Sequence, residues 1–447
     1  MSSKGAFNFI DLFSGIGGFH AVLGGMGGQC VLASDIDEKA KRVYELNWGI
    51  EPKGDLRKFA TSTRVTAPPT DTRVSVLAAG FPCQPFSKSG KQKGMTEDRG
   101  TLFDHIIYLV EKRKPSVVLL ENVRNLAGPR HRHEFNYVIE KLRNAGYVVS
   151  SKPAVFSPHR IGPAFGGRPQ IRERLFITAT YCQSKKNLEP EPLSLIPGTE
   201  MQDINSWNIL DYLDPSIKSN RSLELSNDEV MWLEAWEYFQ KKMRESSKVR
   251  LPGFPMWADE WVAPKSLAAR ARRLDQVPDW KKTFLTNNWN IYESNSLLID
   301  KWKKQFLINE FPVSRRKFEW QAQDADSIWN CTVHLRPSGI RVKRLTYLPA
   351  LVAMNQTSII GPERRRISPT EAARLQGLPD GFCFGDQSLG QTYKQLGNGV
   401  NVGVVWQVLR AHVQRDIEIL RQLDPALVKA VKKAPPSPDE INFGFTK

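Results

Sequence analysis

Long apolar runs are absent from this 447-residue sequence, and cysteine is scarce. No stretch of about 18 consecutive apolar residues occurs, which excludes a membrane-spanning helix. The first residues lack the apolar core and cleavage site of a secretory signal, so we expect a cytoplasmic protein. Only five cysteines occur, and no two form a Cys-x-x-Cys pair. This pattern argues against a disulfide framework and a structural zinc site, and we expect no bound metal.

Acidic residues are few relative to basic ones. The sequence has 47 Asp and Glu against 63 Lys and Arg, which gives a net charge of +16. Such an excess favours a polyanionic partner, nucleic acid first, although a merely basic protein is an equal alternative from charge alone. The 40% hydrophobic and 25% charged fractions are those of an ordinary globular protein and exclude a wholly disordered chain. The length allows two or three domains.

Short β-branched runs alternate with segments of helical periodicity over the first 180 residues. This alternation predicts an α/β fold, a Rossmann-like parallel sheet with helices on both faces. From about 181 to 365 the alternation is lost, and ten of the twelve tryptophans occur there. We predict a smaller, irregular second domain over 181–365, with its tryptophans mainly in the core. Residues 366–422 would then complete the first domain, and 423–447 would form a polar, proline-containing, mobile tail.

Residues typical of functional sites follow four of the predicted strands. They are Gly15 to Gly18, Asp35, Cys83 and Glu121. Because ligands bind beyond the carboxyl ends of strands in an open α/β sheet, these groups are expected to converge on one crevice.

The glycine loop and Asp35, about 20 residues later, are typical of a site for an adenosine-bearing ligand. A dinucleotide fingerprint would need glycine at position 20, where the sequence has His20, so a pyrophosphate is not supported. Asp55 is a further candidate contact to adenine. The alternative is that these glycines serve only to turn the chain.

Cys83 lies between Pro82 and Gln84-Pro85. The two prolines restrict the backbone and would fix the direction of the sulfur. A nucleophilic cysteine and a structural one are about equally supported by the residues alone. Glu121 either caps a following helix or acts in the crevice. Arg172 and Arg174 either form surface ion pairs or hold an oxygen atom of a ligand.

Ordered motifs along the chain resemble those of the cytosine-5 DNA methyltransferase family. They include Asp11–Gly18, Gly80–Ser87, Glu121–Val123, Gln170–Arg174, Arg366–Pro379 and Gln395–Val400. The resemblance implies catalysis by Cys83 as nucleophile and Glu121 on the cytosine ring, assisted by Arg172 and Arg174. It also implies S-adenosyl-L-methionine as cofactor, with Asp35 on the ribose and Asp55 near the adenine amine. The residues implied to bind the cofactor are Phe13, Ser14, Gly15, Gly17, Asp35, Ile36, Asp55, Leu56, Pro82, Leu102, Asn398 and Val400. Ile36 departs from the aromatic residue that family members often carry there, so stacking on adenine is not expected.

Double-stranded DNA is the partner that the resemblance implies, with the target cytosine flipped out of the helix. Segment 181–365 corresponds to the family's target recognition domain, and Phe86–Gly100 to its mobile catalytic loop. The residues expected to contact DNA are Ser87, Lys91, Arg99, Arg336, Arg341 and Lys343. The family implies a bacterial enzyme, associated with the nucleoid through DNA, that protects DNA from a cognate restriction endonuclease. No stable protein partner is implied, and a monomer suffices.

Two other functions compete with this interpretation. A tRNA cytosine-5 methyltransferase of the same fold is disfavoured by the long tryptophan-rich segment. A catalytically silent DNA-binding protein is disfavoured because it would have no use for Cys83 and Glu121.

Overall fold

The computed structural model describes residues 5–69, 71–82, 102–185, 187–217, 220–247, 251–262, 266–351 and 357–445. The chain forms two compact units. The first unit comprises Met1–Trp207, Pro349–Ala353 and Pro369–Lys447, and the second comprises Asn208–Leu348 and Met354–Ser368. Residues 181–207, which the sequence assigned to the second domain, therefore belong to the first unit.

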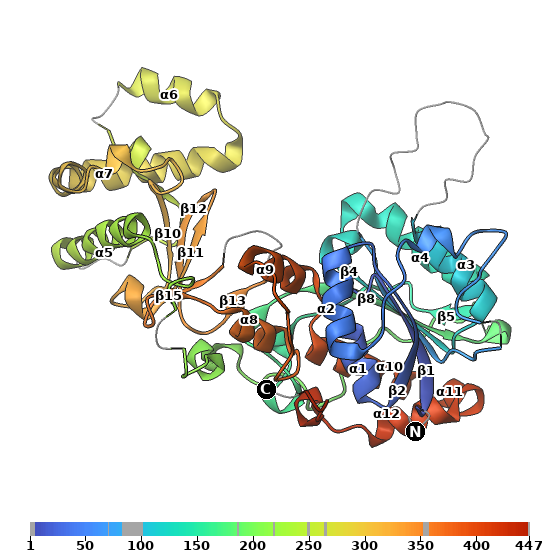
Figure 1. Ribbon diagram of the computed structural model, residues 1–447. Helices are drawn as coiled ribbons and strands as arrows, with labels where there is room; N and C mark the ends of the chain where they lie inside the picture. The colour runs from blue at the N-terminus through green and yellow to red at the C-terminus, as the bar shows by residue number, and fades with distance from the viewer. Residues whose placement is uncertain are drawn as a thin grey trace. The chain divides into compact units, whose positions relative to one another are not determined.

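A seven-stranded sheet forms the centre of the first unit, in the order β2-β1-β3-β4-β8-β5, with β6 paired to β8 (Figure 1). The strands are β1 (Phe7–Leu12), β2 (Gly28–Ser34), β3 (Val76–Gly80), β4 (Val117–Val123), β5 (Tyr147–Val149), β6 (Ala154–Phe156) and β8 (Arg174–Tyr181). β1 to β4 are parallel, as expected. β8 is antiparallel to β4, because it begins beside the end of β4, where Arg174 pairs with Val123.

Helices cover both faces of this sheet, which confirms the predicted α/β architecture. They include α1 (Gly18–Gly25), α2 (Glu38–Trp48), α3 (Leu102–Arg113), α4 (Arg132–Asn144), α8 (Pro369–Gln376), α9 (Leu389–Asn398) and α10 (Val402–Arg415). Successive residues of a strand point to opposite faces, so Val117 and Leu119 join one hydrophobic core while Val118 and Leu120 join the other. Burial on both faces explains why β4 is continuously apolar.

The predicted mobile tail is wrong, because the described residues after 423 are folded against the first unit. After α11 (Ile417–Leu423), α12 (Pro425–Lys433) buries Leu427 and Val431 in the core that contains α10. The Trp406 indole N–H then donates a hydrogen bond to the Pro435 carbonyl at 3.1 Å. The apolar side of α12 outweighs the polar composition of this segment.

The second unit contains a six-stranded sheet in the order β15-β14-β11-β12-β10-β9. Its strands are β9 (Met256–Trp257), β10 (Lys317–Gln321), β11 (Thr332–Arg336), β12 (Gly339–Lys343), β14 (Ile359–Ile360) and β15 (Arg365–Arg366). Its α-helices are α5 (Asn227–Ser247), α6 (Leu267–Asp275) and α7 (Asp279–Gln305). The core is aromatic, as expected: Trp236 stacks on Phe318 at 4.6 Å, and Trp261 and Trp302 are fully buried.

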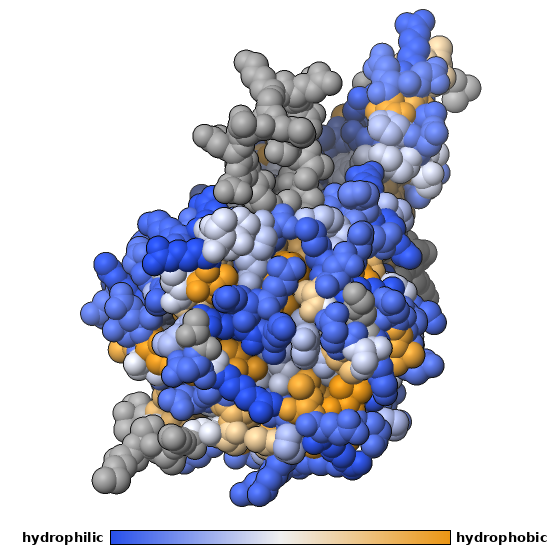
Figure 2. All heavy atoms as spheres, turned by 90° about the vertical axis from the view of Figure 1, so that its right-hand side faces the viewer, coloured by the Kyte–Doolittle hydropathy of each residue, from blue (hydrophilic) through white to orange (hydrophobic). Residues whose placement is uncertain are grey.

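Hydrophilic side chains cover most of the face of the molecule seen in Figure 2, and hydrophobic residues are scattered between them. Scattered surface hydrophobics of this kind are ordinary and need no partner to explain them. Among the described residues, no helix combines the length and apolar character needed to cross a membrane.

Candidate functional site

The loop between β1 and α1 is tied to the end of β2 through Asp35. One carboxylate oxygen of Asp35 accepts a hydrogen bond from the Gly15 N–H, and the other accepts one from the Asp37 N–H, both at 2.8 Å. The loop backbone is left-handed at Phe13 (φ 55°), Gly15 (φ 52°) and Gly17 (φ 93°). The two strand ends predicted to share a site are therefore joined directly.

This loop fits an adenosine-bearing cofactor. The hydroxyl oxygen of Ser14 is buried and has no hydrogen-bond partner among the described residues, and a Cβ at Gly15 would meet open space. Burial raises the pKa of Asp35, so its carboxylate would gain from hydroxyl donors such as those of a ribose. Ile36 is 73% exposed next to it and offers apolar contact for a base.

Asp55 and Leu56 lie beside the same strand end. The Ser34 hydroxyl donates to the Gly54 carbonyl at 2.7 Å, and Asp55 caps the short helix η1 (Leu56–Lys58). Leu56 is buried, whereas Asp55 forms an ion pair with Arg57 at 2.6 Å, which lowers the pKa of that carboxyl group. Contact between Asp55 and an adenine amine would therefore compete with Arg57.

A buried ion pair between Glu121 and Arg174 lies at the end of β4. The Arg174 Nε atom is 2.9 Å from a Glu121 carboxylate oxygen, and only 8% of Glu121 is exposed. Burial raises the pKa of Glu121, and the guanidinium groups of Arg174 and Arg172 partly oppose that increase. The next short helix, η2 (Arg124–Ala127), has no side-chain cap, so Glu121 is not a helix cap.

Glu121 also lies opposite Gly80, the last residue of β3, because β3 and β4 pair in parallel. The neighbouring Asn122 side chain donates to the Phe81 carbonyl at 3.0 Å. This bond fixes the chain two residues before Cys83. Asn122 lies within the Glu121–Val123 motif, but its role could not be predicted from the sequence, because the bond forms only when β3 and β4 pair in this register.

Arg172 is buried and holds segments that are far apart in the sequence. Its guanidinium group donates to the carbonyls of Leu351 at 3.2 Å, Gly397 at 2.8 Å and Gly399 at 2.6 Å. Burial, followed by the nearby Arg174 charge, lowers the pKa of Arg172 to about 9. These contacts exclude the surface ion pair considered for Arg172, and its guanidinium group holds these three segments together.

The last motif lies against the glycine loop. A Cβ at Gly18 would approach a methyl group of Val400 to 2.6 Å, and one at Gly80 would lie 3.9 Å from the other methyl group. Asn398, at the end of α9, is exposed, and its side chain has no hydrogen-bond partner among the described residues. The described part of the chain thus brings the ends of β1 to β4 together with residues near its C-terminus.

Known proteins are similar in sequence to this chain over almost its whole length. The family described as C-5 cytosine-specific DNA methylase matches residues 7–414. The chain belongs to this family. It is 43% identical to the type II methyltransferase M.AluI of Cellulosimicrobium cellulans, over 94% of both chains, and 27% identical to M.BanI of Aneurinibacillus aneurinilyticus, over 92% of this chain and 97% of that one. A solved structure of a DNA modification methyltransferase encoded within an Escherichia coli prophage shares the fold, with a TM-score of 0.50 at 19% identity over 91% of this chain and 99% of that one.

This methylase is accordingly an S-adenosylmethionine-dependent enzyme that methylates carbon 5 of cytosine in DNA. Four of its predicted site residues, Cys83, Ser87, Lys91 and Arg99, lie outside the described residues. Two that flank them are described: Pro82 is exposed, and Leu102 begins α3 half-buried.

The methylase carries a polar array on one face of the sheet in its second unit. The Arg341 Nε atom lies 2.7 Å from a Glu319 carboxylate oxygen, and Arg336 lies 3.9 Å from the same oxygen. Lys343 follows on the same face, where burial and the Arg341 charge lower its pKa. The predicted DNA-contacting residues of this unit therefore gather around one acidic side chain, Glu319, which the sequence analysis did not single out.

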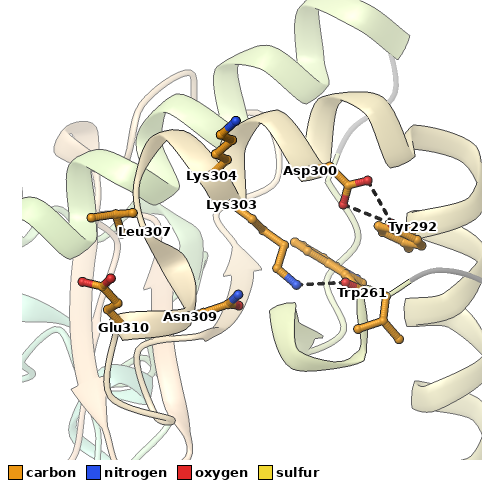
Figure 3. A pocket seen from close by; sticks show the side chains of 9 residues that line it. Trp261, Tyr292, Asp300, Lys303, Lys304, Leu307, Asn309 and Glu310 are labelled. Atoms are coloured by element: carbon orange, nitrogen blue, oxygen red, sulfur yellow. Dashed lines mark hydrogen bonds between the residues drawn. The ribbon is translucent and has the colours of Figure 1, made fainter.

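A hollow of about 510 Å³ in the second unit is lined by none of the predicted site residues (Figure 3). Three of its polar side chains form hydrogen bonds: Lys303 donates to the Trp261 carbonyl at 2.9 Å, and the Tyr292 hydroxyl donates to Asp300 at 3.0 Å. The Lys303 bond connects α7 to the segment around Trp261, and the Tyr292 bond joins two turns of α7, so both stabilise the fold around the hollow.

Proposed function

We propose that this methylase modifies one cytosine within a specific double-stranded DNA sequence, the sequence that M.AluI modifies, and thereby protects DNA from a restriction endonuclease. The identity to M.AluI over 94% of both chains carries this proposal, because a relationship of that extent includes the second unit. A target cytosine is stacked inside the duplex, so the enzyme must extrude it at a cost of about a few kcal/mol.

Cys83 is the proposed nucleophile. Its thiolate adds to carbon 6 of the cytosine, which breaks the aromatic system and makes carbon 5 nucleophilic. Bound S-adenosylmethionine supplies a methyl group on a sulfonium centre for carbon 5 to take. Carbon 5 then loses its proton to water or another base, and the electron pair left behind restores the double bond between carbons 5 and 6. The bond from sulfur to carbon 6 breaks with its electron pair on sulfur, which regenerates the thiolate.

Glu121 is the proposed partner of the cytosine ring. Burial raises the pKa of its carboxyl group. In its protonated form, this group can donate to ring nitrogen 3 while the second oxygen accepts from the exocyclic amine. Arg174 holds the carboxyl group in place through their contact of 2.9 Å. Ring nitrogen 3 is where negative charge develops after the thiolate adds, so this hydrogen bond strengthens in the transition state.

The polar array on the second unit is the proposed reading surface for the target sequence. Glu319 and Arg341 lie opposite each other on β10 and β12, and Gln321 donates to Glu319. Arginine, glutamine and glutamate pair respectively with guanine, adenine and the cytosine amine in the major groove. Apolar residues alternate with these side chains and point into the core, which holds the array on a rigid sheet.

Bisulfite sequencing of DNA from cells that express the methylase tests this function. We expect methylated cytosine at one position of one sequence, and protection of that DNA from a nuclease that cuts the M.AluI sequence. Purified enzyme should transfer labelled methyl groups to duplex DNA and not to tRNA. Methylation at a different sequence would overturn the shared specificity, and transfer to tRNA alone would overturn the DNA substrate.

Arg341→Lys keeps the positive charge but removes the planar fork that reads a base. One bidentate contact gives about 1–3 kcal/mol of discrimination, so kcat/KM on the target should fall about 5- to 150-fold relative to sites that differ by one base pair. The matched control is Arg344→Lys, three residues later in the chain, whose side chain pairs with Asp324. Equal losses in both variants, or unchanged site preference in Arg341→Lys, would contradict the proposed reading surface.

A further inference from the structure

The indole of Trp48 lies directly against the glycine loop of the first unit. Its N–H donates a hydrogen bond to the Ile16 carbonyl at 3.1 Å. A Cβ on Gly17, the next residue, would lie 2.0 Å from the indole nitrogen, so only glycine fits at that position while Trp48 is in place. Trp48 thus fixes the peptide group between Ile16 and Gly17.

Other aromatic rings surround Trp48. On one side it stacks on His20 of α1, with ring centroids 4.5 Å apart and planes 17° apart. Phe443 and Phe445, near the C-terminus, contact the indole edge to face, with their ring centroids 5.8 and 5.4 Å from that of Trp48. Phe382 completes the surroundings at 6.1 Å.

A second link ties the end of α2 to the same region. The Asn47 side chain donates to the Cys383 carbonyl at 2.7 Å and accepts from the Cys383 N–H at 2.8 Å. Residues 382–383 and 443–445 are thereby assembled around the last turn of α2. Phe443 and Phe445 lie beyond residue 414, where the match to the methylase family ends.

We propose that Trp48, held by the C-terminal segment Asn442–Phe445, is a positioning residue for S-adenosylmethionine. The loop of Ser14 to Gly17 has left-handed residues and a buried hydroxyl without a partner among the described residues. Asp35 holds the loop at Gly15, and the Trp48 indole holds it at Ile16. Holding the loop in its binding conformation lowers the ordering cost of cofactor binding. Because Trp48 contacts the loop and not the reacting atoms, it acts on cofactor affinity and leaves the chemical step unchanged.

Trp48→Phe tests this role, since it keeps the aromatic stack and removes only the N–H donor. Loss of one such hydrogen bond predicts about 3- to 10-fold weaker binding of S-adenosylhomocysteine, measured by isothermal titration calorimetry. The KM for S-adenosylmethionine should rise by the same factor, while kcat at saturating cofactor stays within about twofold. The paired variant Phe443→Leu and Phe445→Leu should weaken binding in the same direction, although both substitutions lie far from the loop in sequence.

Trp207→Phe is the matched control. Its indole also donates to a backbone carbonyl, that of His159 at 2.9 Å, within the same unit but on another segment. This variant should bind S-adenosylhomocysteine like the wild type even where its thermal unfolding midpoint falls. The proposal fails if Trp48→Phe binds S-adenosylhomocysteine as tightly as the wild type, if its kcat falls instead of its affinity, or if Trp207→Phe weakens binding equally.

Discussion

Replacing Cys83 by serine is expected to abolish methyl transfer while leaving cofactor binding unchanged. A serine hydroxyl is not ionised near neutral pH, so it cannot supply the anionic nucleophile that adds to carbon 6 of cytosine. Removing an enzymatic nucleophile costs on the order of 10⁴-fold or more in kcat. Methyl transfer to duplex DNA from labelled S-adenosylmethionine measures the loss, and calorimetry with S-adenosylhomocysteine shows that the fold and the cofactor loop remain intact.

A duplex with 5-fluorocytosine at the target position makes this prediction sharper. Fluorine replaces the hydrogen that must leave carbon 5 as a proton, so the sulfur–carbon bond formed by Cys83 cannot break again. The wild type should form a complex with DNA that survives detergent, and Cys83→Ser should form none. Cys182→Ser is the control, because Cys182 is half-exposed and has no assigned role. A covalent complex with Cys83→Ser, or the loss of that complex in Cys182→Ser, would exclude Cys83 as the nucleophile.

Strand ends made the catalytic half of the fold predictable from the sequence. Each apolar run is buried on both sheet faces, and the residue after it emerges at the carboxyl edge, so Asp35 and Glu121 could be placed without tertiary information. The two arginines of Gln170–Arg174 could not be separated in this way. Arg174 meets Glu121 because β8 runs back along β4, whereas Arg172 meets the carbonyls of residues 351, 397 and 399. Those partners are close only after folding.

The prediction of a mobile tail at residues 423–447 was wrong for a different reason. Its composition is polar, and the prolines at 435, 436 and 438 indicated a mobile tail, yet the local signals for a helix were present. Asp424 precedes Pro425, and its side chain accepts a hydrogen bond from the Leu427 N–H at 3.2 Å, as an N-cap residue does. Apolar residues at 427, 428 and 431 then form one face of α12. The apolar periodicity of these nine residues therefore indicates the helix better than the polar composition of the whole segment does.

Glu121→Gln distinguishes proton donation from hydrogen bonding at the cytosine ring. Glutamine offers the same pattern as a protonated glutamate, an N–H toward ring nitrogen 3 and an oxygen toward the amine, but it cannot transfer a proton. If charge on the ring is neutralised by a proton from Glu121, kcat should fall about 10²- to 10⁴-fold while the affinity for S-adenosylhomocysteine is kept. Glu134→Gln, at another buried glutamate, on α4, is the matched control and should retain wild-type kcat. Retained kcat in Glu121→Gln would reduce the role of Glu121 to a hydrogen bond.

The pH dependence of stability tests the raised pKa on which this role depends. Because the pKa of Glu121 is raised above its ordinary value of 4.5, the folded enzyme binds a proton that the unfolded chain has released. Stability must then decrease as pH rises from about 4.5 through the raised pKa, since the unfolded state binds fewer protons over that range. Glu121→Gln lacks this proton, so its free energy of unfolding relative to the wild type should increase with pH when both are measured by urea denaturation. A difference that decreases with pH would mean that Arg174 keeps Glu121 ionised, and the carboxylate could then only accept hydrogen bonds from the exocyclic amine.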